Sequence, residues 1–129
     1  MLKCIALLLG CLLASPAFAN VDIELAQVST LDTRYYSYSF GDVRVNSSRW
    51  ADFNFNNRGP EAVKIDRIDL WGQFFHGQTN CPAVLAAGAA CRVSVEFRPV
   101  FDGYTTGRLS FLTSSGDVVI DLSGWGRRY

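Results

Sequence analysis

Residues 92–98 read Arg-Val-Ser-Val-Glu-Phe-Arg, the clearest strand pattern in the chain. Polar and apolar side chains alternate strictly, so the apolar side chains share one face of the segment and the polar ones share the other. This alternation predicts a strand of an antiparallel sheet with one buried face. Val93, Val95 and Phe97 are therefore expected to point into a hydrophobic core.

Segments on both sides of this strand also have strand character. Strands or strand fragments are predicted at residues 21–38, 52–56, 62–65, 68–70, 107–113 and 117–123. Residues 56–60 (NNRGP) predict a turn, because asparagine and glycine tolerate a positive φ and proline cannot join a ladder. Turns recur at short intervals and helical periodicity is absent after the first 20 residues. The pattern predicts one domain built as a two-sheet β-sandwich, with Phe97, Leu109, Phe111 and Leu122 in its core.

The composition and charge of the chain argue against several classes of function. The 129 residues include 49% hydrophobic side chains, 12 basic and 12 acidic residues, and one histidine. A balanced charge gives no long-range field that would attract nucleic acid. Because His76 is the only histidine, the usual multi-histidine metal sites and histidine-centred hydrolytic sites are not expected. The sequence predicts a non-enzymatic protein without a metal or another cofactor.

The first 19 residues have the order of parts found in a secretory signal peptide. A positive start with Lys3 precedes an apolar run at residues 4–14, and Ala17 and Ala19 place small side chains around Phe18. Cleavage after Ala19 is expected to leave residues 20–129 as a single domain in the periplasm or the medium. No segment is apolar enough to span a membrane, which takes about 20 residues.

A second interpretation of the N-terminus is a lipid anchor. Residues 8–11 (LLGC) resemble the box before the lipid-modified cysteine of bacterial lipoproteins, so Cys11 would carry the lipid. Only about six apolar residues would then precede the cut, against about 7–15 in a typical signal peptide. The sequence favours cleavage after Ala19.

Two cysteines, Cys81 and Cys91, remain after that cleavage. In an oxidising compartment a disulfide between them is the expected state, because His76 alone does not complete a metal site. The closed loop of about eleven residues would contribute about 3 kcal/mol to stability.

Several segments together resemble the ASH-type (ASPM/SPD-2/hydin) immunoglobulin-like domains, which also occur in bacterial choice-of-anchor D proteins and are related to the major sperm protein fold. The resemblance covers residues 40–126 and rests on four stretches, residues 40–48 (FGDVRVNSS), 53–59 (FNFNNRG), 81–99 and 103–126. In the third stretch, Cys81 and Cys91 match the family's cysteine positions ahead of its core strand.

The resemblance implies an all-β, immunoglobulin-like antiparallel sandwich of seven to eight strands. The family is defined by structural residues, so it implies a scaffold or binding module and no shared active site. We therefore expect an exported structural or protein-interaction module of the bacterial envelope or secreted fraction, which binds another protein through loops or an exposed strand edge.

The alternative function is carbohydrate binding. Tyr35, Tyr36, Tyr38, Trp71 and Phe74 are dense enough for some of their rings to remain exposed, and exposed rings can stack on sugars or anchor a protein partner. This alternative requires at least two of the rings on one solvent-exposed surface.

Overall fold

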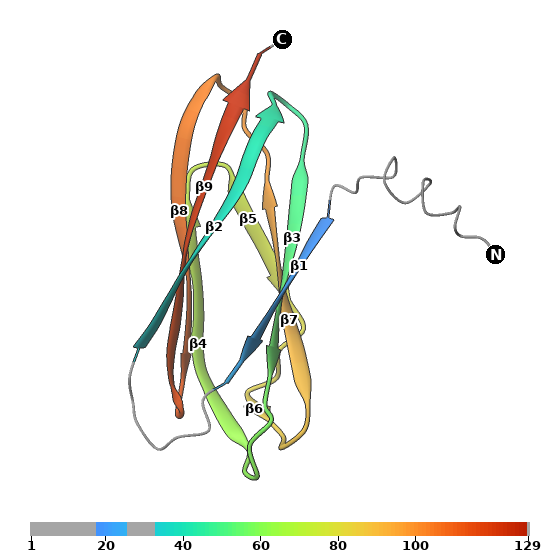
Figure 1. Ribbon diagram of the computed structural model, residues 1–129, viewed down its shortest axis with the longest axis vertical. Coiled ribbons are helices and arrows are strands. Elements are labelled where there is room, and N and C mark those ends of the chain that lie inside the picture. The colour runs from blue at the N-terminus through green and yellow to red at the C-terminus, as the bar shows by residue number, and fades with distance from the viewer. Residues whose placement is uncertain (1–17, 26–32, 129) are drawn as a thin grey trace, which may run out of the picture.

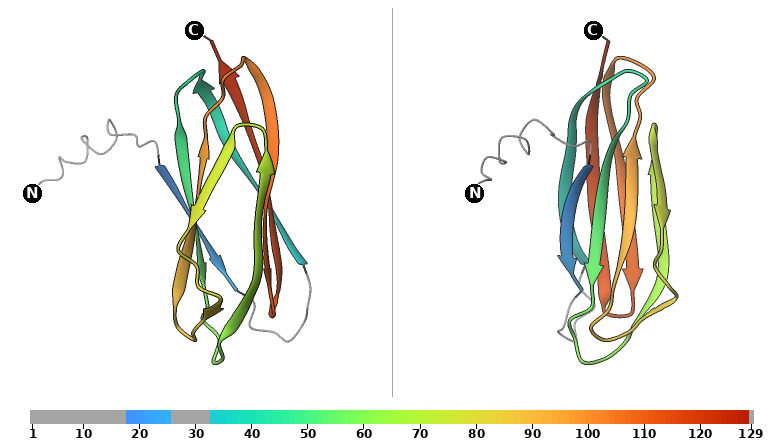
Figure 2. Two further views of the ribbon diagram at one scale, coloured as in Figure 1. Left: turned by 180° about the vertical axis from the view of Figure 1, so that it is seen from behind. Right: turned by 90° about the vertical axis from the view of Figure 1, so that its right-hand side faces the viewer.

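The computed structural model describes residues 18–25 and 33–128 of the chain. These residues form nine strands in two sheets that pack face to face (Figures 1 and 2). The strands are β1 (Phe18–Glu24), β2 (Thr33–Arg44), β3 (Arg49–Asn56), β4 (Val63–Gly72), β5 (Phe75–Thr79), β6 (Val84–Leu85), β7 (Ala90–Phe97), β8 (Gly103–Thr113) and β9 (Gly116–Arg127). The predicted all-β sandwich is confirmed.

The strand order places β7 and β9 inside the sheets and β1 and β2 at their edges. The four-stranded sheet has the order β1-β3-β7-β5, and the five-stranded sheet has the order β2-β9-β8-β4-β6. Two pairings are parallel, β1 with β3 and β2 with β9, where the sequence predicted an antiparallel sandwich. The strand count is nine rather than seven to eight, because the N-terminal region supplies an edge strand to each sheet and β6 has only two residues.

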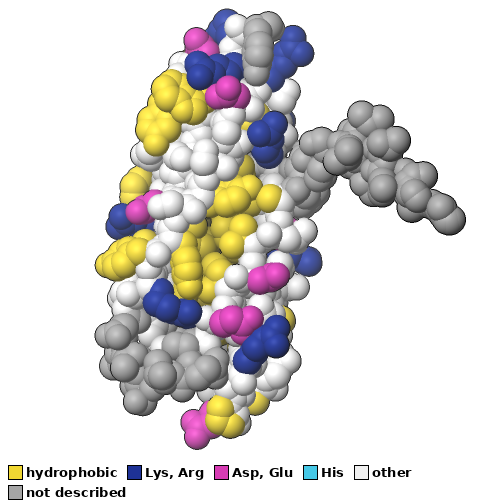
Figure 3. Space-filling view, in the orientation of Figure 1, with side chains coloured by type: hydrophobic (Ala, Val, Ile, Leu, Met, Phe, Trp, Pro, Cys, Tyr) yellow, Lys and Arg dark blue, Asp and Glu magenta, His cyan; other side chains and the backbone are white. Residues whose placement is uncertain are grey.

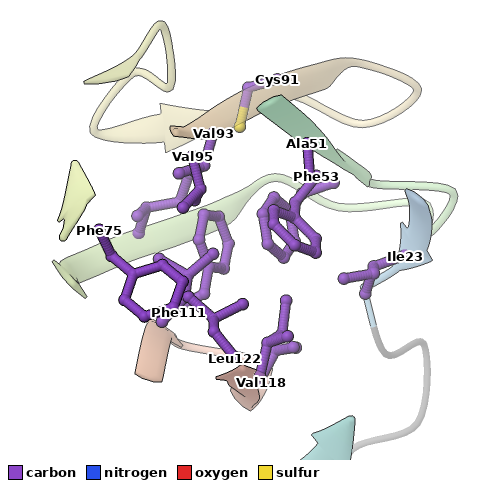
Figure 4. Packing of buried hydrophobic residues seen from close by; sticks show 14 of the residues in the cluster. Ile23, Ala51, Phe53, Phe75, Cys91, Val93, Val95, Phe111, Val118 and Leu122 are labelled. Atoms are coloured by element: carbon purple, nitrogen blue, oxygen red, sulfur yellow. The ribbon is translucent and has the colours of Figure 1, made fainter. Parts of the chain in front are cut away.

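The predicted core strand is β7, and its apolar face is buried as expected. Val93, Val95 and Phe97 are each at most 3% exposed, and β3 and β5 flank the strand. Side chains of both sheets meet in the core (Figure 4). Among them, the rings of Phe55 and Phe111 stack with centroids 3.8 Å apart. Each such side chain contributes about 1.5–3 kcal/mol when fully buried. Leu109 and Leu122, also predicted to lie in the core, are at most 1% exposed.

Strand β4 joins two segments that the sequence separated. The ladder between β4 and β8 shifts register between Ile65 and Arg67, so one extra residue is accommodated there. Because of this bulge, the inward positions change from Ile65 to Ile68 and Leu70. The change of phase explains why alternation predicted two short pieces at 62–65 and 68–70.

The two cysteines form the predicted disulfide. Cys81 lies after β5 and Cys91 lies in β7, and their sulfur atoms are 2.02 Å apart. The bridge ties the start of the β5–β7 connection to the beginning of β7.

Loss of this bridge is expected to lower the free energy of unfolding by about 3 kcal/mol, because the unfolded chain regains the freedom of the loop that the bridge closes. The measurement compares urea unfolding of the oxidised protein with that of the Cys81→Ser/Cys91→Ser variant. Equal midpoints for the two proteins would contradict the expectation.

Strand β1 begins before the predicted cleavage point. Phe18 pairs with Trp50 and Ala19 with Ala51, so the last two residues of the predicted signal peptide extend the edge of β3. Cys11 and the rest of that peptide lie outside the described residues, and export stays a prediction. Within residues 18–25 and 33–128, no helix is long and apolar enough to cross a membrane.

Candidate functional site

The side chains that a catalytic or metal site would need are dispersed. No group of three His, Cys, Asp or Glu residues within the described part of the chain lies close enough to hold a metal ion. His76 is exposed on β5 and lines a concavity of about 440 Å³ between β4 and β5, with Ile68 and Leu70 on its other side.

Strand β2 is the longest edge strand in the described structure. It pairs with β9 on one side only, and it has 12 residues, against seven in β1, five in β5 and two in β6. Residues 35–41 of β2 (YYSYSFG) contain no charged side chain, whereas β1 carries Asp22 and Glu24. Charged residues and short length are what usually protect strand edges from pairing with another chain. β2 is long, and the charged side chains Arg34, Asp42 and Arg44 lie only near its two ends, so residues 35–41 lack both forms of protection.

The gap between the edges of β1 and β2 has an apolar lining. Ala19 and Val21 of β1 and Tyr36 and Tyr38 of β2 are partly buried and pack against the core; we call these four residues the β1–β2 seam. Figure 3 shows hydrophobic side chains gathered in the centre of this face, between the two strands. The Tyr38 ring packs edge-on against Phe53, with centroids 5.5 Å apart. Part of the hydrophobic core is therefore accessible at the surface in the β1–β2 seam, next to the unpaired edge of β2.

Burial raises the pKa of the Tyr38 phenol above its usual value of 10.0, and the charge of Arg49 opposes this shift. A raised pKa means that the folded protein holds the phenolic proton more tightly than the unfolded chain does. The contribution of the Tyr38 phenol to stability is complete below pH 10 and is lost as the pH rises above 10.

We expect Tyr38→Phe to weaken the alkaline loss of stability, measured by urea unfolding at increasing pH together with phenolate absorbance. Identical pH profiles for the two proteins would contradict this assignment.

The five aromatic residues proposed as a binding set do not form one surface. Tyr35 and Trp71 point outward from the five-stranded sheet and are 68% and 57% exposed. Tyr36 and Tyr38 point the other way, into the β1–β2 seam. Phe74 lies in the turn between β4 and β5 with a positive φ of 75°, and its ring is 5.8 Å from that of Phe101. Successive side chains of β2 point to opposite faces of the sheet, so Tyr35 lies on the opposite face from Tyr36 and Tyr38.

The predicted set of aromatic residues left out a pair of exposed rings that lie side by side on β8 and β9. Tyr104 of β8 and Trp125 of β9 are 56% and 39% exposed and pair across the ladder, with ring centroids 4.8 Å apart. The guanidinium of Arg127 lies 4.6 Å from the centroid of the Trp125 ring. Figure 3 shows hydrophobic side chains over this end of β8 and β9. The alternation of residues 117–123, extended by two residues, would have placed Trp125 on the outward face.

The two packed sheets, with one parallel edge strand in each, have an immunoglobulin-like, ASH/PapD-like fold. No family model and no curated protein matches the sequence.

Solved structures share this fold at low sequence identity. An ASH/PapD-like domain of human CEP192 matches with a TM-score of 0.57 and 15% identity, over 74% of this chain and 84% of that one. The secreted serine protease VesC from Vibrio cholerae matches with a TM-score of 0.54 and 20% identity; the match covers 68% of this chain but 21% of the protease chain. PbICP-C, solved in complex with falcipain-2, matches with a TM-score of 0.50 and 10% identity, over 83% and 99% of the two chains. These likenesses concern the fold.

Proposed function

We propose that this domain is an exported, non-enzymatic interaction module that binds a protein partner by adding one of the partner's strands to the edge of β2. The observation that carries the proposal is the open edge of β2, which is uncharged over residues 35–41. In strand addition, main-chain hydrogen bonds supply affinity and pockets for alternate side chains supply specificity. The β1–β2 seam offers such pockets directly beside the edge.

The composition of the edge indicates what the partner strand looks like. The outward side chains near the middle of β2 are Tyr35, Ser37 and Ser39, which are exposed, while Tyr36 and Tyr38 line the seam. A partner strand of alternating character, apolar toward the seam and polar toward solvent, matches both sides. The partner is therefore expected to contain a strand that is exposed, or that can detach from its own sheet, and in which every second residue is apolar.

The experiment compares three tagged proteins as baits in an envelope extract. The edge variant is Thr33→Lys/Ser37→Lys, because lysine on an edge strand opposes pairing with another chain. The control is Thr106→Lys/Ser110→Lys, which adds the same charge at the same spacing on β8, inside the same sheet. Proteins that bind by strand addition are enriched by the wild type and the control and are lost from the edge variant.

The second step uses a partner purified from that experiment. Its addition is expected to protect backbone amides of β2 from hydrogen exchange and to leave β5, the edge of the other sheet, unchanged. A partner that the edge variant binds as well as the wild type, or protection confined to other strands, would refute the proposal.

A further inference from the structure

The outward face of the five-stranded sheet carries four exposed rings on four different strands. The residues are Tyr35 of β2, Trp71 of β4, Tyr104 of β8 and Trp125 of β9. Ladder partners place them on one face, because Tyr104 pairs with Trp125, Trp71 pairs with the outward Arg108, and Tyr35 pairs with Val119. The inward positions between them belong to buried residues such as Leu109 and Ile120.

The charges on this face cancel locally. Three arginines point outward from β4, β8 and β9, and each pairs with an aspartate: Arg67 with Asp69 at 2.8 Å, Arg108 with Asp121 at 2.8 Å, and Arg127 with Asp42 at 3.2 Å. These exposed pairs contribute little to stability. They do leave the face without the excess of one sign that would attract a polyanion or a charged peptide.

Hydroxyl groups occupy the positions between the rings. Ser37, Ser110, Ser123 and Thr106 lie on the outward side of β2, β8 and β9, and their side chains make no hydrogen bond to another residue in the described ranges. Each hydroxyl can donate and accept a hydrogen bond. The face therefore combines exposed rings, available hydroxyls and neutralised charges, which is the chemistry that a neutral polyhydroxylated ligand requires.

We propose that this face binds an extended, neutral polysaccharide chain. The ring of Tyr104, supported by Trp125, is one contact for the apolar face of a sugar ring, and Trp71 is a second. Tyr104 lies four residues along β8 from Arg108, the ladder partner of Trp71, so the two contacts are about 14 Å apart. A single sugar reaches one contact, and an oligosaccharide reaches both. The two ring contacts lie on β4, β8 and β9, away from the backbone edge of β2, and do not depend on the proposed protein partner.

The experiment measures binding of chitohexaose and cellohexaose, and of their disaccharides, by calorimetry and by tryptophan fluorescence, with a heparin hexasaccharide as the anionic comparison. At least one neutral hexasaccharide is expected to bind saturably at low-millimolar or lower concentration, and the heparin fragment is expected not to bind. Tyr104→Ala should weaken binding of the hexasaccharide at least tenfold, whereas Tyr104→Phe, which keeps the ring, should retain it.

Two further variants distinguish specific binding of the polysaccharide from non-specific hydrophobic adsorption. Trp71→Ala is expected to weaken the hexasaccharide and leave the disaccharide unchanged, because only the longer ligand spans both contacts. Phe101→Ala removes a ring that is 61% exposed in the turn between β7 and β8, and it is expected to change nothing. Absence of binding to both neutral hexasaccharides, preference for the heparin fragment, or an equal loss with Phe101→Ala would overturn the proposal.

Discussion

Replacement of Gly124 by valine is expected to destabilise the domain by roughly 4 kcal/mol or more, which approaches the whole stability of many domains of this size. A Cβ atom at this position would clash with the ring of Phe97, lying 2.8 Å from both Cδ2 and Cζ and closer still to Cε2. The Phe97 ring is fully buried and is held by Phe75, with centroids 4.9 Å apart, and by Phe40, at 5.7 Å. The ring therefore has little room to move away. Urea unfolding followed by tryptophan fluorescence measures the loss.

The control for this substitution is the neighbouring Ser123→Val, on the outward face of β9, which is expected to change stability by less than about 0.5 kcal/mol. A double-mutant cycle identifies the clash itself. Gly124→Ala and Phe97→Leu should cost less together than the sum of their separate effects, by about 1 kcal/mol, because leucine vacates part of the space. Additive effects would show that the contact with Phe97 is not the cause.

Removal of the Asn57 side chain is expected to be the second most damaging change, with a loss of roughly 3–5 kcal/mol for Asn57→Ala. The side chain is 2% exposed, and its amide nitrogen donates to the carbonyls of Glu61 at 2.9 Å, Leu85 at 3.0 Å and Ala86 at 3.2 Å. Its carbonyl oxygen accepts from the N–H of Gly59 at 3.1 Å. Each buried group left without a partner costs about 1–3 kcal/mol.

Asn57→Asp tests the direction of these hydrogen bonds, because aspartate has the same shape but cannot donate when ionised. It is expected to be at least as destabilising as alanine at neutral pH, since a carboxylate would face three carbonyl oxygens. The adjacent Asn56→Ala, in a half-buried position at the end of β3, is the matched control and should stay within about 0.5 kcal/mol. Equal midpoints for Asn56→Ala and Asn57→Ala would refute the role assigned to Asn57.

Asn57 also shows which information the sequence lacks. The NNRGP segment predicted a turn, and the chain bends at residues 59–61, but none of residues 56–60 has the positive φ that was expected there. Asn57 is needed for its side-chain amide. Leu85 and Ala86, two of its partners, lie 28 and 29 residues away in sequence, so local patterns give no sign of these contacts.

Strand faces were predictable wherever alternation was strict and one side was clearly apolar, as in β7. The tyrosines of β2 lack that contrast, because both faces of residues 35–38 carry aromatic rings. Whether each tyrosine is exposed or buried depends on which face of β2 meets the core, and the pairing of β2 with β9 decides which face that is. The disulfide and the core rings were predictable because each depends on local spacing or on a strong apolar pattern.

The parallel pairing of β2 with β9 has a consequence for when the domain can fold. Tyr35 pairs with Val119, so the ladder of β2 can form only after β9 has been synthesised. Contacts of such long sequence separation slow folding, because the whole intervening chain must be ordered before they are made. The five-stranded sheet is therefore expected to be completed only after β9 has been synthesised, rather than strand by strand as the chain emerges.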